Sequence, residues 1–179
     1  MKFQPNQHYI SNDAVMTPIE LCERLYHHFA PKGKILEPCR GSGNFYDTFD
    51  QEKDWCEIAE GRDFFDYRNK VDCIMTNPPW SKMRAFLSHS MNLADDIYFL
   101  ITINHLWTKA RIRDIAQNHF GMKEICIFDT PKNFPQSGFQ VGMVHLKRNY
   151  TDGIVLNRLS QDCPMPIYQH SHDVLQQAA

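Results

Sequence analysis

Long apolar segments are absent from this sequence of 179 residues. No window approaches the roughly 20 consecutive apolar residues that a membrane span needs, and residues 1–10 carry no secretory signal. Internal repeats are absent too, and the length is typical of one soluble domain. We therefore expect a cytoplasmic protein that has no contact with a membrane.

Paired cysteine motifs are missing as well. The six cysteines are Cys22, Cys39, Cys56, Cys73, Cys126 and Cys163. None forms a Cys-x-x-Cys pair, which argues against a zinc site and, without a signal peptide, against a disulfide framework. We expect reduced cysteines that pack as small hydrophobic residues, and no bound metal.

The chain has no excess of positive charge, because 19 Lys and Arg stand against 21 Asp and Glu. Attraction to nucleic acid over the whole surface is therefore excluded. The charges are nevertheless unevenly distributed. Residues 76–148 hold nine basic and five acidic side chains, whereas residues 1–75 hold nine and thirteen. Only the middle of the chain is a candidate for contact with a polyanion.

Short apolar runs alternate with helical patterns along most of the chain. Strands are expected at 34–37, 55–58, 71–75, 97–103, 125–128 and 141–146, and helices at 17–29, from 44, at 81–93 and at 108–119. Thr17 and Ser81 are the expected N-caps of two helices. This alternation predicts an α/β fold, a doubly wound and mainly parallel sheet with a terminal antiparallel strand pair. Residues 151–179 are expected to add an edge strand and a loose tail.

A glycine-containing turn follows the first expected strand. The segment Glu37-Pro38-Cys39-Arg40-Gly41-Ser42-Gly43 joins that strand to a brief helix. Glycines allow positive φ angles and a close approach of ligand to backbone, and the following helix offers free amides. Because strand-to-helix turns also need glycine for structural reasons, this motif alone is a weak signal.

Acidic residues follow the second strand. Glu57 stands where nucleoside-binding sheets carry a carboxylate that accepts hydrogen bonds from ribose hydroxyls, with Glu60 as a rival. Asp63 could accept from an exocyclic amine while Phe64 lies against a purine. Taken singly, Phe64 and Phe65 are better explained as core residues beside a turn aspartate.

Asn77-Pro78-Pro79-Trp80 is the most specific motif in the sequence. Two consecutive prolines cannot continue a central strand or a helix, so they hold the chain in a rigid, extended turn. This turn presents the Asn77 side-chain carbonyl and the Pro78 backbone carbonyl to one point, where both hydrogens of an amino group could be bound. Trp80 supplies a flat face for stacking a planar ring. A purely structural Pro-Pro turn is the less favoured explanation.

Segments 36–45 and 76–80 together resemble the glycine motif and the catalytic tetrapeptide of S-adenosylmethionine-dependent amino-methyltransferases, above all the N6-adenine DNA enzymes of bacteria and phages. Asp13 and Thr17-Pro18 are similar to the family's N-terminal cofactor motif. The resemblance covers residues 12–147. It implies a Rossmann-like methyltransferase domain at 1–150, S-adenosyl-L-methionine as cofactor and DNA, or alternatively RNA, as partner.

The resemblance also implies roles for individual residues. The implied cofactor site consists of Thr17, Glu37, Pro38, Cys39, Gly41, Gly43, Glu57, Asp63, Phe64 and Asn77. The implied catalytic residues are Asn77, Pro78, Pro79 and Trp80. A second stacking aromatic is expected at Phe134 or Phe139, and the choice between them stays open. The candidate phosphate contacts, which are equally well explained as solvated helix faces, are Lys82, Arg84, Lys109, Arg111 and Arg113.

Two departures from the family pattern have structural consequences. Only five residues separate Glu57 from Asp63, too few for the helix and strand that usually lie between these sites. We therefore expect a sheet that is trimmed after its second strand. The 99 residues after Trp80 leave no room for a separate target-recognition domain, so a homodimer or a partner subunit remains open.

The resulting hypothesis is direct methyl transfer to the N6 amine of an adenine that is flipped out of DNA. Adenine in RNA and the glutamine amide of a protein are alternatives that use the same chemistry. A catalytically idle binding subunit is a third alternative, and the intact motif at 77–80 argues against it. The sequence leaves open a role in restriction-modification.

Overall fold

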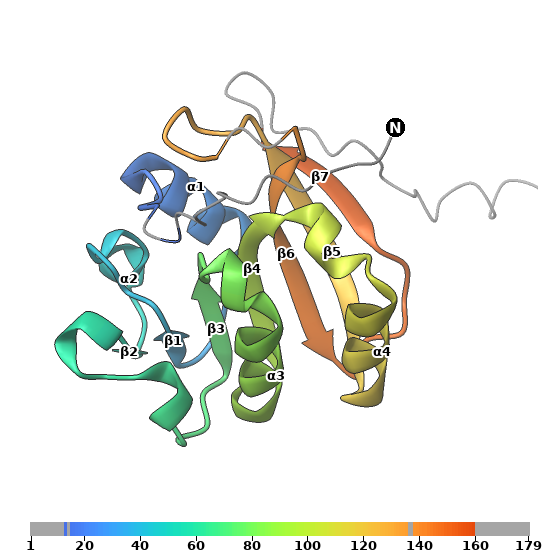
Figure 1. Ribbon diagram of the computed structural model, residues 1–179, viewed down its shortest axis with the longest axis horizontal. Helices are drawn as coiled ribbons and strands as arrows, with labels where there is room; N and C mark the ends of the chain where they lie inside the picture. The colour runs from blue at the N-terminus through green and yellow to red at the C-terminus, as the bar shows by residue number, and fades with distance from the viewer. Residues whose placement is uncertain (1–12, 14, 136–137, 160–179) are drawn as a thin grey trace, which may run out of the picture.

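The computed structural model describes Asp13, residues 15–135 and residues 138–159. These residues form a seven-stranded sheet in the order β2-β1-β3-β4-β6-β5-β7, flanked by helices (Figure 1). The strands are β1 (Ile35–Glu37), β2 (Lys53–Trp55), β3 (Cys73–Thr76), β4 (Asp96–Thr102), β5 (Phe120–Phe128), β6 (Val141–Arg148) and β7 (Val155–Leu159). The α-helices are α1 (Ile19–Phe29), α2 (Asn44–Thr48), α3 (Met83–Leu93) and α4 (Lys109–Gln117).

Strand direction confirms the expected fold class. Neighbouring strands among β2, β1, β3 and β4 are parallel, and β6 is antiparallel to both β4 and β5. β7 then pairs with β5 in parallel at the edge. The sheet is thus mainly parallel and contains one antiparallel strand, β6, between β4 and β5.

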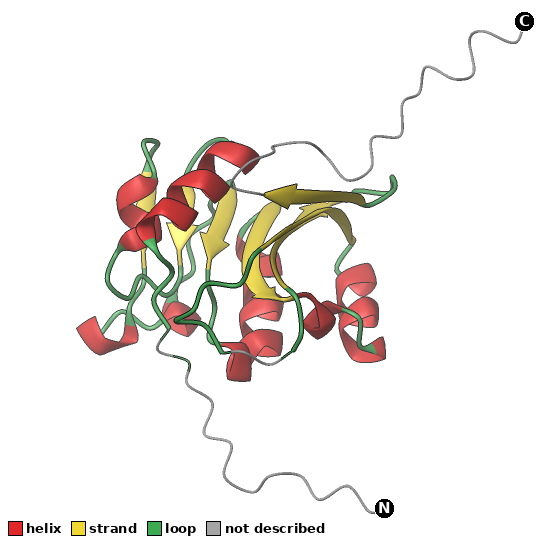
Figure 2. Cartoon of the chain, turned by 90° about the horizontal axis from the view of Figure 1, so that it is seen from above, coloured by secondary structure: helices red, strands yellow, loops and turns green. Residues whose placement is uncertain are grey.

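Each central strand places alternate side chains on opposite faces of the sheet, as the pleat requires. Ile74 and Phe99 pack with Leu87 of α3, whereas Met75 packs with Leu25 of α1. Seen from above, α1 and α2 lie on one side of the sheet, and α3 and α4 lie on the other (Figure 2). Burial on both faces explains why the central strands are continuous apolar runs.

The sheet ends at β2, as the short spacing between Glu57 and Asp63 predicts. Two 3-10 helices, η1 (Ile58–Glu60) and η2 (Phe64–Asp66), replace the missing helix and strand. At this edge the guanidinium groups of Arg40 and Arg62 each lie 4.0 Å from the centre of the Trp55 ring. Such cation–π contacts cover an edge strand without adding another strand.

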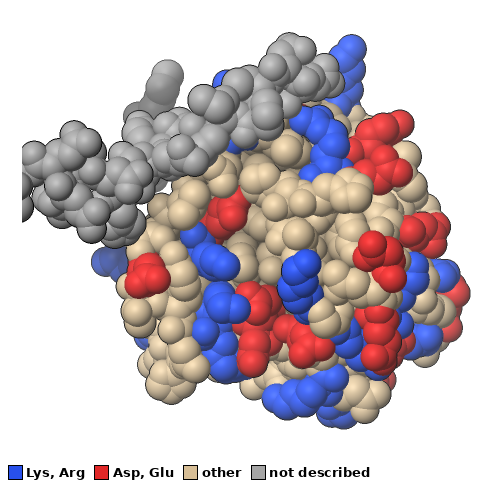
Figure 3. All heavy atoms as spheres, turned by 180° about the vertical axis from the view of Figure 1, so that it is seen from behind, with Lys and Arg blue, Asp and Glu red and all other residues tan. Residues whose placement is uncertain are grey.

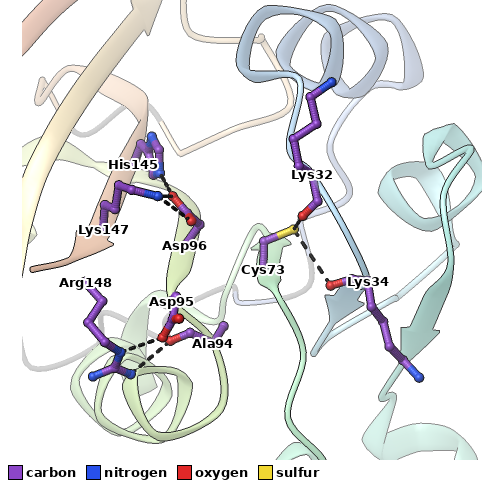
Figure 4. Close-up of polar contacts among 9 residues, drawn as sticks. All are labelled: Lys32, Lys34, Cys73, Ala94, Asp95, Asp96, His145, Lys147 and Arg148. Atoms are coloured by element: carbon purple, nitrogen blue, oxygen red, sulfur yellow. Dashed lines mark hydrogen bonds and ion pairs between the residues drawn. The ribbon is translucent and has the colours of Figure 1, made fainter. Parts of the chain in front are cut away.

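Ion pairs fasten the antiparallel strand at the end of the sheet where β4 begins (Figure 4). Asp96 accepts hydrogen bonds from His145 at 2.6 Å and from Lys147 at 2.8 Å, and the neighbouring Asp95 pairs with Arg148 at 2.6 Å. These ion pairs hold β6 in register with β4.

On the face seen from behind, basic and acidic side chains are interspersed (Figure 3).

Several expected boundaries were wrong. Thr17 does not cap α1, because Pro18 occupies that position and makes no side-chain cap. Ser81 lies instead within η3 (Trp80–Lys82), and Lys82 precedes α3. The second strand ends at Trp55 and not at Ile58, which is exposed in η1.

Two sequence predictions extend beyond the described residues. Cys163 and the expected tail at 160–179 lie outside them, whereas the five described cysteines are free. Within the described ranges, no helix combines the length and apolar character needed to cross a membrane.

Candidate active site

A cleft of about 610 Å³ opens where the parallel strands end. This volume lies within the range of about 300–1,000 Å³ that is usual for small-molecule sites. The cleft brings together most residues of the implied cofactor site and one candidate phosphate contact. The predicted residues that line it are Pro38, Cys39, Gly41, Glu57, Asp63, Phe64, Asn77, Pro79 and Lys82.

The glycine turn requires glycine for two reasons: the backbone has positive φ angles, and a neighbouring side chain leaves no room for a Cβ atom. Gly41 and Gly43 have φ angles of +53° and +92°, in the region that favours glycine. A Cβ at Gly41 would come within 2.7 Å of the Met16 sulfur. The turn is therefore held against residues that precede α1.

Glu57 links this turn to the second strand. Its two carboxylate oxygens accept from the backbone N–H groups of Gly41 at 2.8 Å and Ala59 at 3.0 Å. A carboxylate has about four acceptor positions, so Glu57 keeps capacity for ligand hydroxyls. Its rival Glu60 also lines the cleft and pairs with Arg40.

Glu37 is a buried carboxylic acid, with 2% of its surface exposed. Burial raises its pKa well above the ordinary value, and a backbone hydrogen bond from Tyr46 only partly opposes this shift. Its Oε2 has no hydrogen-bond partner among the described residues. A small cavity that is also lined by Thr17 and Asn44 lies next to it. An unpaired acceptor at this place suits a cationic or N–H-bearing ligand.

Asp63 and Phe64 lie on the far side of the cleft. Asp63 Oδ1 accepts from the backbone N–H of Phe65 at 2.9 Å. The Phe64 ring is 2% exposed and packs against Phe86, with ring centres 5.0 Å apart. Phe64 is therefore a core residue that also contributes to the cleft wall.

The Asn77 side chain is fixed by its amide nitrogen. Nδ2 donates to the backbone oxygen of Val15 at 3.1 Å and to Thr17 Oγ1 at 3.3 Å. This contact gives the Thr17 hydroxyl a long-range partner in place of the expected cap. Within the described residues, the side-chain oxygen of Asn77 accepts no hydrogen bond.

Cys39 connects the two motifs. Its sulfur lies 2.9 Å from Thr76 Oγ1 and 3.3 Å from the backbone oxygen of Asn77. Burial raises the pKa of the Cys39 thiol, and the hydrogen bond with Thr76 only partly opposes this. Through these two contacts the Cys39 thiol bridges the glycine turn and the segment 76–80.

Trp80 lies at a second, very small cavity beside the cleft, which Asn77, Pro78 and Phe134 also line. The indole N–H donates to the backbone oxygen of Leu100 at 3.2 Å, and the Phe134 ring centre lies 6.2 Å from that of Trp80. Phe134 is buried, whereas Phe139 is 57% exposed. Of the two aromatic candidates, the structure places Phe134 beside Trp80.

The basic candidates are not equivalent. Lys82 lines the cleft, and Lys109 and Arg113 are exposed on α4. Arg84 instead makes two hydrogen bonds to Asp114, at 2.7 and 3.2 Å. The Arg111 Nε atom is buried and has no partner in the described part of the chain.

Sequence reasoning missed several residues at the site. Val15 and Met16 line the cleft, and the ring centre of His105 lies 6.2 Å from that of Trp80. His105 lies just after a strand that ends beside the site, and its position in the sequence could have identified it as a site residue. Burial and the nearby Arg111 lower the pKa of His105, which favours its neutral form.

No group of three or more His, Cys, Asp or Glu side chains within residues 13, 15–135 and 138–159 could hold a metal ion. The donor set at the cleft consists of backbone amides, carboxylates and amide side chains, which suits an organic ligand.

No protein-family model and no curated protein matches this sequence. Solved structures do match. The EcoKI type I restriction enzyme M protein (EC 2.1.1.72) is 14% identical, with a TM-score of 0.60 over 87% of this chain and 50% of that one. A Listeria monocytogenes protein, described as a class I S-adenosylmethionine-dependent methyltransferase, is 14% identical, with a TM-score of 0.58 over 86% and 68%.

This chain has the fold of the class I methyltransferases. The ribosomal protein L11 methylase of Lactobacillus delbrueckii subsp. bulgaricus has the same fold, with 12% identity and a TM-score of 0.52 over 74% of this chain and 77% of that one. At these identities the likeness concerns the fold. The chain spans about half the length of the EcoKI M protein that it matches.

Proposed function

We propose that this chain is an S-adenosylmethionine-dependent methyltransferase that acts on the N6 amine of adenine in DNA. One observation carries the proposal: the Asn77 amide nitrogen is anchored to Val15 and Thr17, so the side-chain oxygen remains available beside Trp80. An amine acceptor site and a cleft for a small molecule thus meet at one residue, which lines both cavities.

The residues of the cleft, together with Glu37 at the small cavity next to it, fit the cofactor. The unpaired Glu37 Oε2 suits an ammonium group, the Glu57 carboxylate suits ribose hydroxyls, and the free oxygen of Asp63 suits an adenine amine. Phe64 and Phe65 give the wall an aromatic surface. When bound, S-adenosylmethionine would supply a methyl group: the amine nitrogen would form the new N–C bond as the S–C bond breaks, S-adenosylhomocysteine would leave, and the proton that the amine loses would pass to water.

Catalysis by the chain's own residues consists of positioning. Asn77 Oδ1 and the Pro78 carbonyl accept the two amine hydrogens, which holds the nitrogen lone pair out of conjugation with the ring. Trp80 stacks on the flipped base and offsets part of an unstacking cost of a few kcal/mol. Its own orientation is fixed by the hydrogen bond to Leu100.

DNA is favoured over other substrates because the matched structures include the M protein of a type I restriction enzyme. The exposed Lys109 and Arg113 of α4 are the proposed phosphate contacts. Trp107, which is 49% exposed just before this helix, offers a further stacking surface. The L11 methylase likeness keeps a protein substrate as the alternative to test.

The test is transfer of a labelled methyl group by the purified protein to unmethylated DNA, to RNA and to a protein extract in parallel. We expect label in DNA and a loss of about 100-fold or more with Asn77→Ala. The matched control is Asn92→Ala, since Asn92 is exposed on α3 and caps only the Ser88 carbonyl. Label only in RNA or protein would correct the substrate, and no transfer to any of the three would overturn the proposal.

A further inference from the structure

Three asparagine side chains hold the segment Val15–Thr17, which we call the strap. Its three consecutive backbone oxygens each accept a side-chain amide: Val15 from Asn77 at 3.1 Å, Met16 from Asn133 at 2.8 Å and Thr17 from Asn44 at 2.7 Å. No two of these donors belong to the same loop. The strap is thus a common attachment point for three separate segments.

The three donors belong to segments with different parts in the site. Asn44 begins α2 directly after the glycine turn, and Asn77 is the amine acceptor of the tetrapeptide. Asn133 precedes Phe134 in the loop between β5 and β6. The strap therefore joins the cofactor turn, the amine site and the Phe134 loop through side-chain hydrogen bonds.

One side of the strap faces the cofactor cleft. Val15 and Met16 line the cleft, and the Met16 sulfur lies against Gly41. A ligand in the cleft consequently contacts the residue whose backbone oxygen accepts from Asn133. Movement of Met16 on ligand binding would be transmitted to Asn133 through this bond.

The Met16–Asn133 hydrogen bond leads from the cofactor cleft to the small cavity at Trp80. Phe134 follows Asn133 directly, is 3% exposed and shares the cavity with Trp80 and Asn77. The cavity has a volume of about 10 Å³, enough for about one water molecule, so this cavity must widen before a planar base can enter, and Phe134 is one of its walls.

We propose that Asn133 is a positioning residue that couples the two cavities: a ligand in the cofactor cleft orders the Phe134 loop through the Met16–Asn133 hydrogen bond. This inference rests on the proposed cofactor. With this coupling, the base pocket takes its final shape only when the cofactor cleft is filled. The two sites are then linked by a coupling free energy that one defined hydrogen bond transmits.

The experiment measures amide hydrogen exchange by NMR with and without S-adenosyl-L-homocysteine, which lacks the transferable methyl group. The reporter is the Phe134 amide, which donates to the Pro131 carbonyl at 3.0 Å. Asn133→Asp keeps the side-chain shape but removes the donor, and Asn133→Ala removes the side chain. Lys132→Ala, at the exposed neighbouring position, is the matched control.

We expect the ligand to slow exchange of the Phe134 amide about tenfold in the original protein and in Lys132→Ala, and less than about twofold in both Asn133 variants. Shifts of the Gly41 and Gly43 amides report ligand binding independently. Equal slowing in the Asn133 variants would overturn the coupling through Asn133. Failure of the ligand to shift those amides in any protein would overturn the proposed cofactor, and this inference with it.

Discussion

Glu37 illustrates how a single residue can favour a ligand at the expense of the fold. Its carboxyl is almost fully buried, and Oε2 has no partner in the described chain. Leaving a buried polar atom unpaired costs free energy that a bound donor would recover. We therefore propose that Glu37 serves ligand binding and not stability.

The first prediction concerns stability against pH for Glu37→Gln. Burial raises the Glu37 pKa, so the folded state binds the proton more tightly than the unfolded state does. The contribution of this carboxyl to stability is therefore fully present below its unfolded pKa and is lost as the pH rises toward the folded value. We expect the melting temperature of Glu37→Gln to exceed that of the original protein by more at pH 8 than at pH 5.

The same substitution should weaken binding of S-adenosyl-L-homocysteine about tenfold or more, because the ammonium group of the ligand would favour the ionised carboxylate of Glu37, and an amide cannot ionise. Calorimetry at one pH measures this, with Glu52→Gln as control at an exposed position that pairs with Lys34. A variant that binds normally and shows the original pH dependence of stability would contradict this role of Glu37.

Between β4 and β6, stability depends on a cluster of charges and not on apolar packing alone. Burial opposes ionisation of Asp96, but hydrogen bonds from His145 and Lys147 outweigh it and lower the Asp96 pKa. The neighbouring Asp95 pairs with Arg148 at the surface, with 71% of its side chain exposed. The two adjacent aspartates thus form a natural comparison.

The second prediction is that Asp96→Asn lowers the free energy of unfolding by about 1–2 kcal/mol at neutral pH, and Asp95→Asn by less than about 1 kcal/mol. A lowered pKa means that the stability due to Asp96 is present above its unfolded pKa and is lost as the pH falls through the folded value. Urea unfolding from pH 7 to pH 3 should therefore show a flatter acid limb for Asp96→Asn. Equal effects of both variants would contradict this account.

The elements themselves differ in how far the sequence predicts them. The Asn77-Pro78-Pro79-Trp80 turn was found locally, because two prolines restrict the backbone whatever surrounds them. The trimmed sheet followed from counting residues between Glu57 and Asp63. In both cases the information lies within a few neighbouring positions.

Long-range partners explain what the sequence did not reveal. Thr17 is a good N-cap by local rules, but its hydroxyl accepts from Asn77, sixty residues away. Asn133 is 117 residues from Met16, and no periodicity predicts that contact. Residues of this kind are recognised only when the fold brings their segments together.

At the scale of the whole molecule, α3 and α4 both carry cations and no carboxylate in the first turn, and α4 carries more of these cations than α3. Lys109 and Arg111 lie near the N-terminus of α4, where the helix dipole disfavours positive charge. On the face seen from behind, by contrast, basic and acidic residues alternate (Figure 3). An arrangement that costs stability is consistent with a polyanionic partner at α4.

The third prediction follows from this arrangement. Removing one phosphate contact should reduce the salt dependence of DNA binding, lowering the slope of log K against log salt by about 0.7–0.9. We expect this for Lys109→Ala and for Arg113→Ala, measured by fluorescence anisotropy over a range of salt concentrations. Lys32→Ala, at an exposed position between α1 and β1, should leave the slope unchanged. Identical slopes for all three variants would show that α4 does not contact the DNA.

The central claim is methyl transfer to adenine N6 at the Asn77 turn. Its most direct test uses cells that lack adenine methylation of their own and express this chain. The N6-methyladenine content of their DNA is measured by mass spectrometry of nucleosides. The account predicts N6-methyladenine with the original protein and a loss of about 100-fold or more with Asn77→Ala at equal expression. DNA without N6-methyladenine from cells that contain the folded original protein would contradict it.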